Sequence, residues 1–231
     1  MSRRRVSNLL ALAVLSCLSE KPMHPYEISS TLRSRGKEHS IKLNYGALYS
    51  VVAALEKHGL IEHQETVREG RRPERTVYAI TEEGVAEFQD WLAELLSSPV
   101  REYTSLEAAL SLFAGLPPEE VVRLLGERVT RLKMEIGAAD ASLRVAEEQG
   151  VPEVFVVETQ YRRALLQAEL TFTSELTERI GSEKLGGTTL WRRLHELQRQ
   201  GVQIHEVFAD PTRYLGEEAS TVTALLNNNS S

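Results

Sequence analysis

Arginine side chains gather in one short stretch of this sequence, and their chemistry suits the binding of phosphate. Residues 68–75 read Arg-Glu-Gly-Arg-Arg-Pro-Glu-Arg, so Arg71, Arg72 and Arg75 lie close to a glycine and a proline. A guanidinium group donates paired hydrogen bonds to phosphate oxygens, and glycine and proline favour a turn. The stretch therefore predicts a basic loop tip that contacts a phosphate backbone. A solvated hairpin tip is the alternative interpretation.

Two strands are predicted on either side of this loop, and a helix before them. Residues 61–67 and 75–80 carry the β-branched and aromatic side chains that suit paired strands. The helix begins after Asn44, whose side chain can accept hydrogen bonds from the first turn, and it closes at Gly59. Its apolar stripe, one residue every three or four, consists of Leu48, Val52 and Leu55. The residues of this region that we expect to face DNA are Lys42, Asn44, Tyr45, Tyr49 and Ser50.

Two further helices are predicted upstream. Residues 8–19 form an apolar helix, and a second helix follows the Pro22-to-Ile28 segment and runs to about Arg35. Three short helices followed by a basic-tipped hairpin make a winged helix-turn-helix, in which the third helix enters the major groove of DNA.

These motifs resemble those of the PadR-type transcriptional regulators. The likeness rests on His24-Pro25-Tyr26-Glu27, Tyr45-Gly46-Ala47-Leu48-Tyr49, the run from Leu55 to Ile61 and the run from Arg75 to Gly84, within residues 9–91. The family pattern usually has glycine in place of Pro25 and serine in place of Asn44 or Tyr45. Proline suits the first turn of a helix, so we expect only a small local change.

The resemblance implies a small, often aromatic, effector bound in apolar space between the DNA-binding head and a helical arm. The candidate lining residues are Leu9, Ala13, Phe88, Trp91, Leu92 and Tyr103. Ordinary core packing is the alternative, because Phe88 and Trp91 have the spacing of a packed helix face.

The N-terminus admits two interpretations. Arg3, Arg4 and Arg5 precede an apolar run that ends near Cys17, as in a secretory signal. No small-x-small cleavage site follows, however, and the run continues into the second predicted helix. We therefore expect a cytoplasmic protein whose three arginines form a basic arm on DNA. A lone cysteine permits no disulfide within one chain.

Charge is distributed unevenly along the 231 residues, of which 42% are hydrophobic. The net charge is −6, yet residues 1–78 hold 13 Lys and Arg against 8 Asp and Glu, and residues 79–231 hold 14 against 25. A basic head on an acidic body favours phosphate contact at one end only.

The rest of the chain is predicted to be helical. Thr81 caps a helix that Pro99 ends, and a short amphipathic helix follows over residues 105–113. A heptad seam then runs from Leu125 towards Gly150, and a second long helix begins at Pro152 and ends near Gly181, which together predict an antiparallel hairpin.

These patterns predict a mainly α protein, with a winged head at residues 1–98, a helical dimerisation domain at 99–181 and a C-terminal extension at 182–231. We expect a homodimer on a palindromic operator, because two recognition helices about 34 Å apart match one turn of DNA. An intrachain bundle is the alternative. The dimerisation residues are predicted to be Leu125, Val129, Leu132, Ile136, Leu143, Tyr161, Leu165, Phe172 and Leu176.

The extension is the least regular part. Residues 188–199 predict an amphipathic helix, residues 204–208 a short strand, and residues 227–231 a disordered tail. The extension has three possible roles: it caps the arm, reaches across a dimer or fills the effector site.

No catalytic constellation is found in the sequence. The six histidines show no metalloprotease spacing; His58 and His63, with Glu56 or Glu62, are the one candidate metal group, and surface contacts are the commoner role of such residues. We expect no enzyme activity, no cofactor and no membrane span. A protein-interaction module with a winged domain that no longer reads DNA remains the alternative function.

Overall fold

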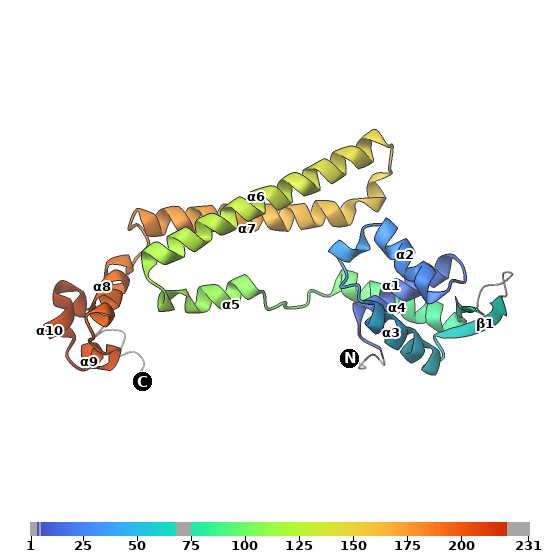
Figure 1. Ribbon diagram of the computed structural model, residues 1–231, viewed down its shortest axis with the longest axis horizontal. Coiled ribbons are helices and arrows are strands. Elements are labelled where there is room, and N and C mark those ends of the chain that lie inside the picture. The colour runs from blue at the N-terminus through green and yellow to red at the C-terminus, as the bar shows by residue number, and fades with distance from the viewer. Residues whose placement is uncertain (1–3, 5, 68–74, 221–231) are drawn as a thin grey trace. The chain divides into compact units, whose positions relative to one another are not determined.

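The computed structural model describes residue 4, residues 6–67 and residues 75–220 (Figure 1). The chain divides into two compact units, residues 1–102 and residues 103–231. We call the first unit the head and the second the arm. Arg3, Arg5, Arg71, Arg72 and the tail at residues 227–231, all of which carry predictions, lie outside the described residues.

The head contains the predicted helices and strands in the predicted order, which confirms its fold class. Its helices are α1 (Leu9–Glu20), α2 (Pro25–Ser34), α3 (Tyr45–Lys57) and α4 (Glu82–Ser97), with a 3₁₀ turn at Lys37–His39. Its strands are β1 (Ile61–Val67) and β2 (Arg75–Ile80). The caps are also as predicted: Asn44 accepts a hydrogen bond from the Gly46 amide, and Thr81 accepts one from the Gly84 amide.

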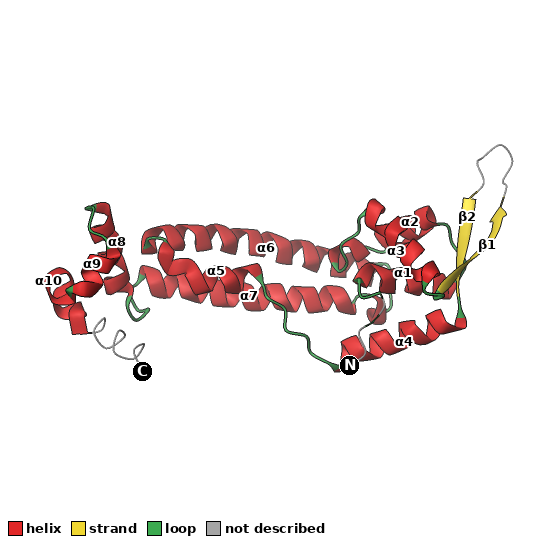
Figure 2. Ribbon diagram, turned by 90° about the horizontal axis from the view of Figure 1, so that it is seen from below, coloured by secondary structure: helices red, strands yellow, loops and turns green. Residues whose placement is uncertain are grey.

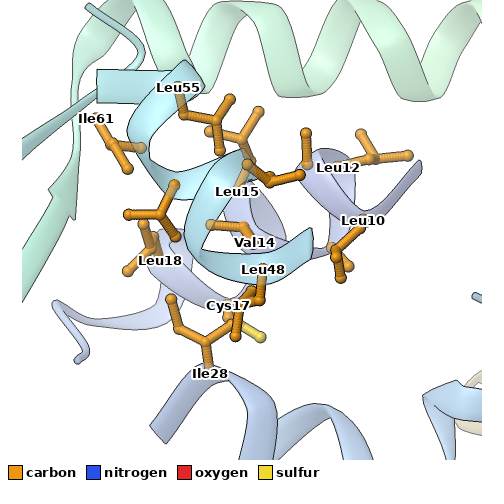
Figure 3. Packing of buried hydrophobic residues seen from close by; sticks show 14 of the residues in the cluster. Leu10, Leu12, Val14, Leu15, Cys17, Leu18, Ile28, Leu48, Leu55 and Ile61 are labelled. Atoms are coloured by element: carbon orange, nitrogen blue, oxygen red, sulfur yellow. The ribbon is translucent and has the colours of Figure 1, made fainter. Parts of the chain in front are cut away.

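The first helix lies at the centre of the head. Seven of its apolar side chains and Cys17 are buried, so α1 contacts α2, α3, α4 and β2 on several sides at once. A helix that is apolar nearly all round is a core helix. Figure 3 shows Leu15 and Leu18 of α1 packed among Leu48 and Leu55 of α3. The stripe predicted for α3 therefore seats this helix on the core.

The two strands form an antiparallel hairpin that is tied to the rest of the head. The register places Ile61 opposite Ile80 and His63 opposite Tyr78, with an irregularity between Gln64 and Val67. Met23, in the α1–α2 turn, exchanges two backbone hydrogen bonds of 3.0 Å with Tyr78. These bonds fix the base of the hairpin relative to α1 and α2.

A tight junction joins the end of α3 to the start of α4. Gly59 adopts a left-handed conformation (φ +72°), and the Leu60 amide donates to the Leu55 carbonyl at 3.0 Å, which closes α3. The Thr81 hydroxyl donates to the Gly59 carbonyl at 2.7 Å. One threonine therefore caps α4 and holds the turn that begins the wing.

The arm is built on a long antiparallel hairpin. Helix α5 (Ser105–Leu112) leads through a 3₁₀ turn (Phe113–Gly115) into α6 (Pro118–Glu148), and α7 (Val157–Gly181) returns beside it (Figures 1 and 2). Between the two long helices lies a 3₁₀ turn (Glu153–Phe155), so α7 begins five residues later than predicted. The buried residues of the two helices are Pro118, Val121, Leu125, Leu132, Ile136, Ala139, Thr173, Leu176 and Ile180.

Two ion pairs add to this apolar seam and fix its register. Arg128 of α6 binds Glu169 of α7 at 2.6 Å, and Arg163 of α7 binds Asp140 of α6 at 2.6 Å. Each arginine reaches a carboxylate on the opposite helix, so sliding one helix by a turn breaks both pairs.

The only regular elements in the described part of the extension are helices, namely α8 (Thr188–Arg199), α9 (Ile204–Ala209), α10 (Pro211–Leu215) and a 3₁₀ turn (Gly216–Glu218), joined by short turns. The strand predicted at residues 204–208 was therefore wrong. The amides of Glu206 and Val207 donate to the Gln203 carbonyl, so this segment satisfies its backbone locally, whereas a lone strand there would need a partner strand. Leu190, Leu197, Val207, Leu215 and Ala219 form its small core.

None of the helices in the described ranges is both long and apolar enough to cross a membrane.

Candidate nucleic-acid interface

Helix α3 presents one face to the core and the opposite face to solvent. Leu48, Val52 and Leu55 are buried, whereas the phenol of Tyr49 is 53% exposed. Lys42, Asn44 and Ser50 are exposed as well. The exposed set can supply a phenol, a hydroxyl and an ammonium group to a ligand as wide as a DNA groove.

Some of these polar groups already have partners within the helix. Asn44 Oδ1 accepts from the Gly46 amide at 2.9 Å, and Ser50 Oγ donates to the Gly46 carbonyl at 3.1 Å. Asn44 therefore has a structural role at the start of α3, and its amide nitrogen is the part that remains to meet a ligand. Tyr45 begins the helix, and its side chain lies outside the described atoms.

In the described part of the wing, β1 ends at Val67 and β2 begins at Arg75. Arg75 is the first residue of β2 and its backbone lies opposite Val67, while its side chain is outside the description. Residues 68–74, which include Arg71 and Arg72, connect these two strand ends. The phosphate role of the three arginines stays a prediction.

Arg4 has partners that the sequence did not suggest. Its guanidinium donates to Glu87 at 2.6 Å, to Asp90 at 2.9 Å and to Glu94 at 2.5 Å, all on α4. It also lies over the ring of Trp91, 5.5 Å from the centroid, and its side chain is only 13% exposed. Arg4 is thus bound to the head itself, which differs from the free basic arm expected of it.

The effector candidates of the head belong to its core. Ala13 and Trp91 are buried, and Phe88 and Leu92 are half-buried against the same cluster. Leu9 is partly exposed at the start of α1. Tyr103 is largely exposed and is the first residue of the arm unit. An effector site lined by these residues remains a prediction.

The dimerisation candidates divide into two groups. Leu125, Leu132, Ile136 and Leu176 are buried within the hairpin, and Val129 and Leu143 are half-buried. Tyr161, Leu165 and Phe172 are about half exposed or more and follow one another on α7 at intervals of four and seven. The sequence placed all of them on one seam, whereas the structure gives α7 an inner face that includes Thr173 and an exposed apolar stripe beside it.

The described part of the arm contains a groove and a cleft. A groove of about 610 Å³ separates α5 from α6, and its apolar lining includes Leu106, Leu110 and Leu124. A smaller cleft of about 290 Å³ lies between Ala114 and α8. In the head, His63 Nδ1 lies 3.3 Å from Glu56, but no group of three metal-ligating side chains is found among the described residues.

Comparison with known proteins finds one family model and several solved structures that are similar to this chain. The family model for the PadR-like transcriptional regulators matches residues 14–90. The crystal structure of Bacillus subtilis PadR in complex with operator DNA is similar, with a TM-score of 0.63 and 16% identity over 75% of this chain and 99% of that chain. Bacillus subtilis PadR in complex with p-coumaric acid gives a TM-score of 0.59 and 16% identity over 75% and 96% of the two chains.

A PadR-like regulator from Bacillus cereus gives a TM-score of 0.54 and 16% identity over 75% and 99%. At such identities the likeness concerns the fold. No curated protein matches the sequence. Each of these three structures covers 75% of this chain.

Proposed function

We propose that this chain is a PadR-like transcriptional regulator, a dimeric repressor that binds a palindromic operator and releases it when a small molecule binds. The observation that carries the proposal is the arrangement of α3. This helix is seated on the core by Leu48, Val52 and Leu55 and keeps Tyr49 and Ser50 exposed beside the anchored base of the wing, and Lys42, just before the helix, is exposed as well.

DNA binding divides between these two elements. The exposed face of α3 meets base edges in the major groove, and the arginines of the wing bind phosphates. Support comes from the similar fold of Bacillus subtilis PadR, which was solved with operator DNA. The excess of basic residues over residues 1–78 also favours phosphate contact by the head.

Dimerisation is proposed through the exposed stripe of α7. Tyr161, Leu165 and Phe172 expose large apolar surfaces on a helix whose other face is already packed. Contiguous exposed apolar side chains of this kind mark an interaction surface. A second copy of the chain that buries the stripe also supplies the second recognition helix, and a twofold dimer requires a palindromic site.

Release by an effector is the finer part of the proposal. The structure of Bacillus subtilis PadR with p-coumaric acid supports a small aromatic molecule as the ligand class. We retain Leu9, Ala13, Phe88, Trp91, Leu92 and Tyr103 as candidate contacts. A ligand releases DNA only if it binds the DNA-free conformation more tightly than the DNA-bound one.

The test is fluorescence anisotropy of the full chain with labelled DNA from its own promoter and with a scrambled duplex, across a salt series. We expect tighter binding to the promoter and a steep loss of affinity with salt. Replacing Arg71 and Arg72 with alanine is expected to weaken binding to both DNAs and to reduce the salt slope by about 2, since each phosphate contact adds about 0.9.

Lys133 and Arg144 provide the matched control, since both are exposed basic residues of α6. Their double alanine variant removes the same charge and is expected to keep the slope. If the variant with Arg71 and Arg72 replaced also keeps the salt slope, the proposed contact between the wing arginines and phosphates is wrong. Equal and weak binding to both duplexes would favour the interaction module, a function to which the acidic arm and the exposed α7 stripe are also suited.

A further inference from the structure

A buried tryptophan of the C-terminal extension binds the turn between α5 and α6. Trp191 of α8 donates from Nε1 to the Leu116 carbonyl at 2.8 Å and to the Ala114 carbonyl at 3.1 Å. Its ring contacts Phe113 edge to face, with centroids 5.1 Å apart, and packs against Val121 and Ile180. A single side chain therefore satisfies two carbonyls of the α5–α6 turn and joins the apolar seam of the hairpin.

Two neighbours on α8 bind the same region. His195 Nε2 donates to the Ala114 carbonyl at 2.9 Å. Arg192 binds Glu119, in the first turn of α6, at 2.7 Å and Glu183, just beyond α7, at 2.6 Å. The Arg192 hydrogen bond also holds the pKa of Glu119 below its usual range. Helix α8 is thus bonded to the ends of both long helices and to the turn between α5 and α6.

Helix α5 is mostly exposed, and its Leu110 packs against the cluster that contains Trp191. None of its eight described residues is buried, and Leu106 and Leu110 are only half-buried. The groove of about 610 Å³ lies between this helix and α6. An eight-residue helix is not stable in water by itself, because the unfavourable free energy of nucleating the helix exceeds the free energy that the hydrogen bonds of two turns contribute. Its position is therefore decided largely at its C-terminal end, where Phe113 contacts Trp191.

We propose that the C-terminal extension is an intrachain clamp, in which Trp191, Arg192 and His195 hold the α5–α6 turn and so fix α5 as one wall of the groove. This role goes beyond DNA recognition and does not depend on it. Of the roles open to the extension, the clamp is the one that its contacts support. Residues that act in this way are positioning residues, because they act on the groove through Phe113 and the turn.

Hydrogen–deuterium exchange of the full chain tests the clamp, followed by mass spectrometry of peptides that cover residues 105–117, residues 130–145 and the head. Trp191→Ala is expected to speed exchange in residues 105–117 by about tenfold, because it removes two hydrogen bonds and the Phe113 contact. Trp191→Phe keeps the apolar ring and loses the donor, so a smaller increase at the same residues is expected. If Trp191→Ala does not fold, the exchange of Trp191→Phe tests the clamp in its place.

Phe208→Ala is the matched control, since Phe208 is a partly exposed aromatic residue of α9 outside the clamp. It is expected to leave exchange in residues 105–117 unchanged. Two results overturn the clamp. One is unchanged exchange at residues 105–117 in both Trp191 variants. The other is an equal increase over residues 105–117 and 130–145, because Trp191 would then support the whole hairpin rather than position α5.

Discussion

The carbonyl oxygen of Leu60 occupies the space that a side chain at Gly84 would need. A Cβ atom built on Gly84 falls 2.0 Å from that oxygen and 2.8 Å from Cγ1 of Ile80. Gly84 lies in the first turn of α4, and Leu60 lies in the turn between α3 and β1, so this turn meets the start of α4 with backbone against backbone. Only glycine permits this approach, which brings the base of the wing onto α4.

Replacing Gly84 with alanine is therefore expected to lower the free energy of unfolding by about 3 kcal/mol, because the clash is with backbone that cannot turn aside. Urea unfolding followed by circular dichroism measures it. Gly137→Ala is the control: a Cβ there meets nothing within 4 Å in the middle of α6, and about 0.5–1 kcal/mol of stabilisation is expected. Equal stability of Gly84→Ala and the native chain would contradict the close approach.

The rate at which a reagent labels the Cys17 thiol is expected to measure how often the head unfolds locally. The thiol is 1% exposed, and burial raises its pKa, an effect that nearby Arg35 partly offsets. Since the thiolate is the reactive form, a raised pKa and burial both slow its reaction. A disulfide reagent at pH 7.5 should leave the folded chain unlabelled and label one thiol in urea. Labelling of the folded chain at the unfolded rate would show that α1 is not held in the core.

Arg4→Ala separates a structural arginine from one that binds DNA. Removing Arg4 leaves Glu87, Asp90 and Glu94 together on α4 without their cation. We expect a loss of about 1 kcal/mol in head stability, in keeping with partly exposed ion pairs, and no change in the salt slope of DNA binding. A slope reduced by about 0.9 would instead place Arg4 on a phosphate.

Thr173 has a buried hydroxyl without a hydrogen-bond partner among the described residues. Valine has nearly the same shape, so Thr173→Val is expected to raise the free energy of unfolding by about 1 kcal/mol. One turn further on, Thr177 Oγ1 donates to the Thr173 carbonyl at 2.7 Å. Thr177→Val should therefore stabilise less than Thr173→Val or destabilise slightly. Destabilisation by Thr173→Val in thermal unfolding would show that the hydroxyl has a partner.

Features governed by neighbours in the chain were predictable from the sequence. The helix ends depend on residues a few positions away: Asn44 and Thr81 cap helices, and Gly59 closes one. The strands at 61–67 and 75–80 are separated in the sequence by a glycine and a proline, which favour a turn. Such signals depend on local backbone geometry, which residue type largely decides.

Contacts between distant residues were not predictable in the same way. Arg4 reads as one of three similar arginines, and nothing near it in the chain indicates the carboxylates on α4. The α7 stripe shows the same limit, since Phe172 and Leu176 both fit an apolar period although only Leu176 is buried. Which of two adjacent faces is packed depends on the opposite helix, and α7 alone does not contain that information.

The order in which the chain is synthesised gives the Trp191 contacts a further consequence. Trp191 is 75 and 77 residues later in the chain than the carbonyls it binds. The head is complete by residue 102, so it can fold on the ribosome while the arm is still being made. The α5–α6 turn, in contrast, has only water for two of its carbonyls until α8 emerges. A truncated or stalled nascent chain would thus carry a finished head and an unfinished arm.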